Sequence, residues 1–191
     1  MEMLEYAHLI GAAKFIGIGT VAEYLFCESI MDVNAKQTPN DMYGAAKTAV
    51  HYLLETCARL LKMHFIWTVI PSTFGEGRRD NNIITYTILS LLRGENRVRI
   101  LDTDVGLFVC QRGSKSIPLY WRKGIAGKTY AIGSGVFKPL KDYITMIREI
   151  INPELELGIG AKPELSDKAF RSCVSIYDLT KDTGFVLEIF F

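Results

Sequence analysis

The sequence predicts an α/β fold built around a parallel β-sheet. Two short runs, residues 14–20 (KFIGIGT) and residues 65–71 (FIWTVIP), are apolar on both faces, which is typical of buried parallel strands. Between them lies a long segment with helical spacing of its apolar residues, at 42–62. Strand and helix go on alternating after residue 71, and such alternation favours an α/β domain with a parallel sheet.

In the first half of the chain we predict a helix, a strand, a loop, a second helix and a second strand, in that order. Residues 2–14 form the end of a helix, and the apolar runs give the strands at 14–20 and 65–71, separated by a loop over 24–41 and the helix over 42–62. Asp41 or Asn40 caps that helix. Its expected apolar face is formed by Ala46, Val50, Leu53, Leu54, Cys57, Leu60 and Leu61.

The second half continues the alternation, with one interruption. We predict a loop over 74–82, a helix over 83–93 ended by Gly94, a strand over 97–101, a strand and turn over 127–135, a helix over 139–151, a strand over 155–160, and a short helix ended by Gly184. Residues 102–123 have neither a helical nor a two-residue period. We therefore divide the chain into segments 1–101, 102–123 and 124–191.

Composition excludes several classes of protein. The chain has 191 residues, 49% of them hydrophobic, and 22 basic against 21 acidic residues give a net charge of +1, which argues against broad electrostatic binding of nucleic acid. No apolar run approaches the roughly 20 residues of a membrane span, and the acidic start does not resemble a signal peptide. The four scattered cysteines predict free thiols, no metal site and a cytoplasmic location.

The chemistry is expected at Tyr43 and Lys47, in the sequence YGAAK at the start of a helix. A spacing of four places both side chains on one helix face. The ammonium of Lys47 stabilises a phenolate over a phenol, so the pair is a usable acid–base device. The pattern YxxxK alone also occurs on solvated helices, and the sequence around it is therefore needed to decide.

That context resembles the NAD-dependent epimerase/dehydratase family, the extended branch of the short-chain dehydrogenase/reductase superfamily. The strand at 14–20 ends in Thr20, Tyr24 follows four residues later, and a loop leads to the helix of Tyr43 and Lys47. The segment TVIPSTFGEGRRDNN resembles the family's strand and loop after the Tyr helix, and YAIGSG its late strand. Leu25 and Ser72 depart from the usual Gly and Asn.

The resemblance implies the C-terminal part of a Rossmann-like parallel sheet with a small substrate-binding α/β region. It implies hydride transfer between a nucleotide sugar and NAD or NADP, by an epimerase, a dehydratase or a 4-keto-sugar reductase. Thr20, Tyr43 and Lys47 would be catalytic, and Tyr43, Lys47, Ile70 and Pro71 would bind the cofactor. The implied substrate-binding residues are Ser72, Arg78, Arg79, Asn81 and Asn82.

Several of these residues have a second interpretation. Arg78 and Arg79 either contact a pyrophosphate or form a solvated loop pair with Asp80. Asn81 and Asn82 either contact the nucleotide or cap the following helix. Glu23 is either an active-site carboxylate or, more commonly for a strand end, solvated, and Trp67 is expected in the core.

The family's glycine-rich dinucleotide fingerprint is not found in these 191 residues. We expect it about 90 to 100 residues upstream, so that the chain is a fragment without the cofactor-binding half. The alternatives are a degenerate, inactive product or one half of a split enzyme that binds a separate cofactor-binding partner. The family's usual homodimer would use the Tyr43 helix and residues 2–13.

We hypothesise that residues 105–123 are translated out of frame. The family expects a pattern like W-D-[FY]-x-Y-V-x-[DE]-V-A here, whereas the chain reads VGLFVCQRGSKSIPLYWRK. Codons that encode this stretch, read one nucleotide later, can encode WDFLYVKEVAKAFRFIGEK. The family's pattern then continues into GIAGKTYAIGSG, so a compensated pair of frameshifts would explain why the periodicity fails and returns.

Overall fold

A three-stranded parallel sheet forms the centre of the computed structural model. The model describes residues 1–24, 30–71, 73–74, 82–95, 98–100, 108–109, 122–133, 140–159 and 174–185. The sheet contains β1 (Lys14–Thr20), β2 (His64–Ile70) and β6 (Thr129–Ala131), in the order β1-β2-β6. β1 and β2 pair in full register, from Lys14 beside His64 to Thr20 beside Ile70, so both strands end at the same level.

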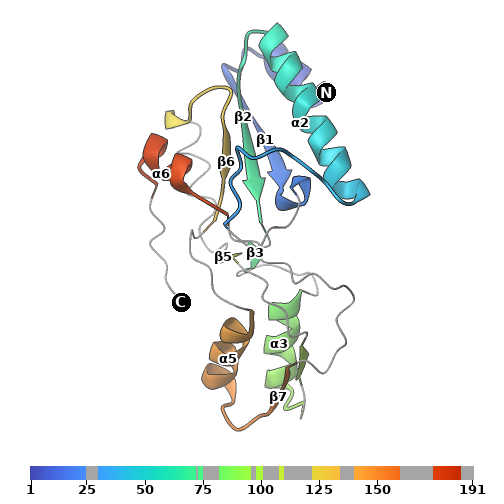
Figure 1. Cartoon of the computed structure of the whole chain (residues 1–191), viewed down its shortest axis with the longest axis vertical. Coiled ribbons are helices and arrows are strands. Elements are labelled where there is room, and N and C mark those ends of the chain that lie inside the picture. The colour runs from blue at the N-terminus through green and yellow to red at the C-terminus, as the bar shows by residue number, and fades with distance from the viewer. Residues whose placement is uncertain are drawn as a thin grey trace.

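Helices cover both faces of this sheet (Figure 1). The helices α1 (Glu2–Leu9) and α2 (Met42–Leu60) lie on one face, and α6 (Tyr177–Thr183) lies on the other. Phe65, Trp67 and Val69 of β2 pack in the cluster on the α2 side, and Ile66 packs with Tyr130 and Leu179 on the α6 side. This alternation is the two-residue period of a strand buried on both faces, as the apolar run predicted.

Helix α2 begins at a capped turn and presents a narrow buried face. Asp41 is its N-cap, and the carboxylate accepts a hydrogen bond of 2.6 Å from the Gly44 amide. The buried residues of the helix are Gly44, His51, Leu54 and Ala58. The apolar face that we predicted is therefore only partly right, since Val50, Leu53 and Leu60 are 43%, 55% and 73% exposed.

A second group of elements packs around α3 (Ile83–Leu92) and α5 (Leu140–Ile151), below the sheet in Figure 1. Ile84 and Leu91 of α3 bury against Leu140, Tyr143 and Ile144 of α5. Two short parallel pairs complete the described residues of this region. They join β4 (Val98–Ile100) to β7 (Leu157–Ile159) and β3 (Thr73–Phe74) to β5 (Phe108–Val109).

The loop before α2 is joined to the C-terminal part of the chain. Met31 forms a parallel bridge with Val174, and the Ser175 amide donates to the Met31 carbonyl at 2.9 Å. The Asn34 amide nitrogen donates to the Asp178 carboxylate at 2.7 Å. These contacts hold residues 31–34 against the start of α6.

Most of the predicted elements are confirmed, with shifts at their ends. The first strand has the predicted bounds, and Gly94 and Gly184 follow helices with φ of 69° and 73°. The first helix is shorter than predicted and ends at Leu9, because Gly11 (φ 76°) turns the chain before β1. β3 and β5 were not predicted. The segment boundaries at 101 and 123 stay predictions.

Two further sequence predictions concern cysteines and membrane spans. Cys57 is a free thiol, while Cys27, Cys110 and Cys173 lie outside the described residues. In the part of the chain that the structure describes, no helix combines the length and the apolar character that crossing a membrane requires.

Candidate active site

The candidate site lies at the carboxyl ends of β1 and β2. The register places Thr20, the last residue of β1, beside Ile70, the last residue of β2, and the buried Pro71 follows. The carboxyl edge of a parallel sheet is where open α/β folds bind their ligands. Thr20, Ile70 and Pro71 were predicted as site residues from two separate segments, and the sheet brings them to the same edge.

The start of α2 is packed against this edge. Gly44 lies so close to the turn after β1 that a Cβ at this position would lie 2.0 Å from the Ala22 carbonyl oxygen. Only a glycine fits here, because the contact is with main chain that cannot rotate away. Gly44 stands between Tyr43 and Lys47, so the close approach also carries these two residues to the end of β1.

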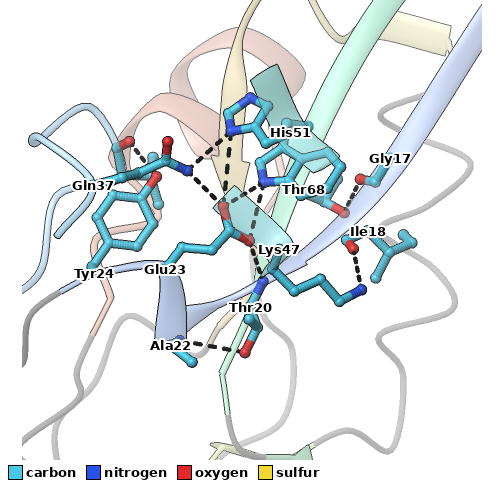
Figure 2. A network of polar contacts seen from close by, with 12 residues as sticks. Gly17, Ile18, Thr20, Ala22, Glu23, Tyr24, Gln37, Lys47, His51 and Thr68 are labelled. Carbon is cyan, nitrogen blue, oxygen red and sulfur yellow. Dashed lines mark hydrogen bonds and ion pairs between the residues drawn. The ribbon is translucent and has the colours of Figure 1, made fainter. Parts of the chain in front are cut away.

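Lys47 crosses from the helix to the strand. Its ammonium donates a hydrogen bond of 3.0 Å to the main-chain carbonyl of Ile18, two residues before Thr20 (Figure 2). Tyr43 lies one helical turn before Lys47, with 57% of its surface exposed. The structure thus brings Lys47 to the strand that ends in Thr20, with Tyr43 on the adjoining turn.

Thr20 also begins the 3₁₀ turn η1 (Val21–Glu23) as its N-cap. The Thr20 hydroxyl oxygen accepts from the Ala22 amide at 3.4 Å, and the Glu23 carboxylate accepts from the Thr20 amide at 2.7 Å. These reciprocal contacts are a capping box. They fix the main chain on both sides of the Thr20 side chain.

Glu23 is fully buried, with an exposed fraction of 0%. Its carboxylate accepts hydrogen bonds from Gln37 Nε2 at 2.6 Å and from the Thr20 amide (Figure 2). It also accepts one from the Trp67 indole at 3.0 Å. Burial raises the pKa of Glu23, while these donors and the charge of Lys47 oppose the rise. The expectation of a solvated strand-end carboxylate was wrong, because the turn points the side chain into the core.

His51 completes the buried cluster from the middle of α2. Its ring stacks on Trp67 with centroids 4.5 Å apart, and its Nδ1 lies 3.0 Å from Gln37 Nε2. Burial lowers the pKa of His51 to about 4, so the ring is neutral at neutral pH. The 3.8 Å approach of His51 Nδ1 to Glu23 is therefore no charged pair, and the Gln37 amide serves both groups as donor. Trp67, 1% exposed, is a core residue as predicted.

Tyr24 has a structural position rather than one in the site. Its hydroxyl donates to the Val33 carbonyl at 2.8 Å, its side chain is buried, and burial raises its pKa above the usual value. The hydrogen bond joins the end of η1 to the loop before α2. That loop also carries Gln37, so Tyr24 supports the part of the chain that reaches Glu23.

The proposed substrate-binding residues are covered only in part. Ser72, Arg78, Arg79 and Asn81 lie outside the described residues. Asn82 caps α3: its side-chain oxygen accepts from the amides of Ile84 and Thr85, both at 3.0 Å. Of the two predicted roles for Asn82, capping is the one that the structure displays.

The sequence contained signals for the buried cluster that we did not use. Thr20-Val-Ala-Glu23 matches the capping-box pattern T-x-x-E, which predicts that the Glu side chain turns back toward the main chain. His51 lies four residues after Lys47 and three before Leu54, which places it on the inner face of α2. The sequence analysis treated it only as one of three scattered histidines.

A cavity of about 370 Å³ opens beside the cluster. Its walls come from the loop before α2, from the middle of α2 and from the start of β6, and include Tyr24, Gln37, His51 and Lys128. Thr20, Tyr43 and Lys47 do not line it. The cavity is therefore separate from the edge at which the predicted catalytic residues lie.

Comparison with known proteins gives one family. A model described as the NAD dependent epimerase/dehydratase family matches residues 1–108, more than half of the chain. This range includes Thr20, Tyr43, Lys47, Ile70 and Pro71. No curated protein matches the chain in sequence.

Solved structures of similar fold cover nearly the whole chain. RMD from Pseudomonas aeruginosa, in complex with NADPH, superposes with a TM-score of 0.85 at 21% identity, over 98% of this chain and 66% of that one. DesIV, a dTDP-glucose 4,6-dehydratase from Streptomyces venezuelae with NAD and TYD bound, gives 0.83 at 16% identity, over 99% and 59%. A UDP-glucose 4-epimerase from Thermotoga maritima with UDP-glucose gives 0.81 at 18%, over 98% and 62%.

These likenesses establish the Rossmann-like α/β fold that the sequence predicted. The chain spans between 59% and 66% of the length of the three solved structures. The parallel order of β1, β2 and β6, with helices on both faces, is the part of that fold which the described residues contain.

Proposed function

The chain belongs to the NAD-dependent epimerase/dehydratase family, and from that premise we propose that it forms the catalytic edge of an enzyme acting on a nucleotide sugar. The reaction is hydride transfer between the sugar and NAD or NADP, in an epimerase, a dehydratase or a 4-keto-sugar reductase. The observation that supports this most directly is the convergence of Lys47 and Thr20 on β1, through the hydrogen bond from Lys47 to Ile18. Tyr43 stands one turn away on the same helix.

Tyr43 is the general acid and base of this mechanism. A phenol that exchanges its proton with the sugar oxygen lets the carbon–hydrogen bond break or form without a charged oxygen being left in the site. Lys47 stabilises the phenolate by its positive charge. The Thr20 hydroxyl hydrogen-bonds the same sugar oxygen and so orients it toward Tyr43.

The residues at this edge fit a nicotinamide dinucleotide. The Lys47 ammonium uses one proton on the Ile18 carbonyl, and an ammonium has three, so donors remain for the ribose hydroxyls. Ile70, half-buried, and Pro71, buried, give the strand end an apolar surface suited to the nicotinamide ring. When bound, NAD or NADP accepts and returns the hydride, while the groups of this chain orient the sugar and move its proton.

The substrate class is supported by the structural neighbours. The Thermotoga epimerase was solved with UDP-glucose, and the Bacillus cereus relative is a UDP-glucuronic acid 4-epimerase in complex with NAD. By analogy, we assign substrate binding to the segment that follows Pro71, with Ser72, Arg78, Arg79 and Asn81. Guanidinium groups suit a pyrophosphate, because they bind it through paired hydrogen bonds.

Tyr43→Phe tests the mechanism, because it keeps the ring and removes only the oxygen that carries the proton. With a cofactor-binding half supplied as a fused or separate chain, turnover should fall by about 10²–10⁴-fold, the usual contribution of a general acid or base. Tyr52→Phe, the same change at an exposed tyrosine of the same helix, is the control. Wild-type turnover in Tyr43→Phe would remove the tyrosine from the mechanism.

We also propose that the chain forms a homodimer through α1 and α2. Both helices expose large apolar side chains, with Tyr6 60%, Leu9 81%, Leu53 55% and Leu60 73% exposed. An exposed apolar surface of this kind is typical of a protein interface. Leu53→Glu should shift the mass measured by light scattering from dimer to monomer, while Tyr177→Glu, at an exposed site on α6, should leave it unchanged.

A second candidate role is that of a module that binds a separate cofactor-binding chain. Among the described residues, β1 pairs with β2 on one side and has no strand on the other. Such an edge is a template for a further strand. Calorimetric titration of NADH into the isolated chain should show no micromolar binding, because the glycine-rich fingerprint that cradles the phosphates is missing from this 191-residue sequence. Binding should appear once a cofactor-binding half is added. Micromolar binding by the chain alone would contradict this role.

A further inference from the structure

We propose that Glu23 is a positioning residue for the Thr20 hydroxyl, acting through the main chain rather than touching the substrate. The inference rests on the proposed function in one respect, the role of Thr20 at the sugar oxygen. The contact that carries it is the 2.7 Å hydrogen bond from the Thr20 amide to Glu23 Oε1. Glu23 itself is 0% exposed, so it has no access to a bound sugar.

The orientation of the Thr20 side chain depends on the turn that follows it. Its main chain is extended, with φ −148° and ψ 153°, and η1 begins at the next residue. The hydroxyl oxygen accepts from the Ala22 amide at 3.4 Å. A hydroxyl engaged in this way keeps its proton and one lone pair for another partner. The main chain of the turn sets where the hydroxyl oxygen lies, and the turn is closed by Glu23.

The carboxylate of Glu23 is held by donors from three other parts of the chain. The Trp67 indole comes from β2, the Gln37 amide comes from the loop before α2, and the Thr20 amide comes from the end of β1. The positive charge of Lys47 further favours the ionised carboxylate. Glu23 therefore locks the end of β1 to the neighbouring strand and to the loop that leads into the Tyr43 helix.

A carboxylate at position 23 restricts the movement of the Thr20 main chain more than a neutral side chain would. Hydrogen bonds to a charged acceptor are about twice as strong as those between neutral groups, and a buried acceptor cannot exchange them for water. A misplacement of about 1 Å in a reacting constellation can cost ~10²-fold in rate. The hydrogen bonds to Glu23 therefore hold the turn after Thr20 more rigidly than a three-residue turn on the surface is held.

Glu23→Gln tests the proposal with the smallest possible change, and Glu55→Gln, on the exposed side of α2, is the matched control. The glutamine keeps the shape of the side chain but removes its charge and offers a donor where the native group has only acceptors. In ¹⁵N-labelled full-length chain, the amide proton of Thr20 and the indole proton of Trp67 should both move upfield in Glu23→Gln. Unmoved resonances would overturn the proposal, and this readout requires no catalytic activity.

The kinetic test uses the same variants with a cofactor-binding half supplied. Glu23→Gln should lower kcat by up to ~10²-fold with little change in KM, because substrate still binds while Thr20 is displaced. In a Thr20→Val background, Glu23→Gln should cause no further loss. A full additional loss in that background would show that Glu23 acts independently of Thr20, and the positioning role would be abandoned.

Gln37→Met serves if Glu23→Gln does not fold. This variant removes one donor and leaves the buried charge in place, so the remaining hydrogen bond from the Thr20 amide should strengthen and its proton should move downfield, opposite to its movement in Glu23→Gln. No movement would count against the proposal. Failure of the proposed function has a different signature: Tyr43→Phe would then be as active as the native sequence, whereas the Thr20 resonance would still respond to Glu23→Gln.

Discussion

Gly19 lies against Trp67 so closely that a Cβ on Gly19 would stand 2.3 Å from the indole nitrogen and 2.3 Å from the nearest Glu23 carboxylate oxygen. The hydrogen bond between Trp67 and Glu23 passes through the space that a side chain would take. We expect Gly19→Ala to lower the free energy of unfolding by about 1–3 kcal/mol, as over-packed cores do. At other strand positions, replacing glycine by alanine ordinarily raises the free energy of unfolding.

Gly94→Ala is the comparison for this prediction. Gly94 has open space around it but a φ of 69°, so alanine there costs only the strain of a left-handed backbone, about 1 kcal/mol. Urea unfolding followed by circular dichroism should rank Gly19→Ala as the less stable variant. The reverse order would mean that Trp67 and Glu23 move apart without cost.

The neutral His51 predicts a specific dependence of stability on pH. The unfolded chain binds a proton at His51 below about pH 6.5, whereas burial lowers the pKa in the folded chain to about 4. Between these values the unfolded state binds more protons, so the contribution of His51 is complete above pH 6.5 and is lost as the pH falls toward 4. The full difference corresponds to roughly 3 kcal/mol.

The difference between two profiles isolates this contribution. Glu23, whose pKa is raised by burial, opposes it, since a folded state that binds the proton more readily is favoured as the pH falls. His51→Phe keeps a ring beside Trp67 and should flatten the loss of stability between pH 6.5 and 4. His64→Phe, at an exposed position, should leave the profile as it is. Identical profiles for the native chain and His51→Phe would contradict a neutral buried His51.

Asp182 joins α6 to the sheet. Its carboxylate accepts from Lys128 Nζ at 2.6 Å and from the hydroxyl of the buried Tyr130 at 2.8 Å. We expect Asp182→Ala to cost about 1–3 kcal/mol, because Tyr130 loses a charged acceptor inside the protein. Asp142→Ala, at an exposed position of α5, should change the stability by less than about 0.5 kcal/mol. Equal effects of the two variants would argue against the role of Asp182.

The same carboxylate gives a second test by pH. The hydrogen bond from Lys128, and then that from Tyr130, hold the pKa of Asp182 below its usual value. The stabilisation is therefore present at neutral pH and is lost as the pH falls through the folded-state pKa. The difference in unfolding free energy between the native chain and Asp182→Ala should shrink in acid.

The out-of-frame hypothesis for residues 105–123 is tested on the coding DNA. The frame shifted by one nucleotide should spell a string with the pattern W-D-[FY]-x-Y-V-x-[DE]-V-A across these codons. A stop codon in that frame, or a string without the pattern, would end the hypothesis. Apart from the pair Phe108–Val109 in β5 and residues 122–123, this stretch lies outside the described residues.

Prediction from the sequence was most accurate for the strands that are buried on both faces. β1 and β2 are apolar on both faces and were predicted to within a residue, since such a run is stable only inside a parallel sheet. β3 and β5 are two residues each and exist because the chain brings Thr73 and Phe108 together, so they have no local pattern to find. The apolar residues of α2 lie on two faces, and periodicity alone could not tell which one the sheet covers.

The candidate site was likewise predictable in part. The family resemblance assigned Thr20 at the end of a strand and Lys47 on the following helix, and in the structure the Lys47 ammonium donates to the Ile18 carbonyl of that strand. Glu23 was misjudged because a strand-end carboxylate is normally solvated, and its burial needs a tryptophan 44 residues away in the sequence and a glutamine 14 away. Such partners follow from the sheet and the loop together, and no local pattern contains them.

The bridge between Met31 and Val174 has a consequence for how the protein is made. The loop that precedes the Tyr43 helix reaches its final place only beside residues 174–178, and Asn34 and Asp178 are 144 positions apart in the chain. During translation, the N-terminal residues leave the ribosome long before their partners exist. Contacts of this range make folding slow, so we expect the loop before the Tyr43 helix to reach its final place only after residues 174–178 have been synthesised.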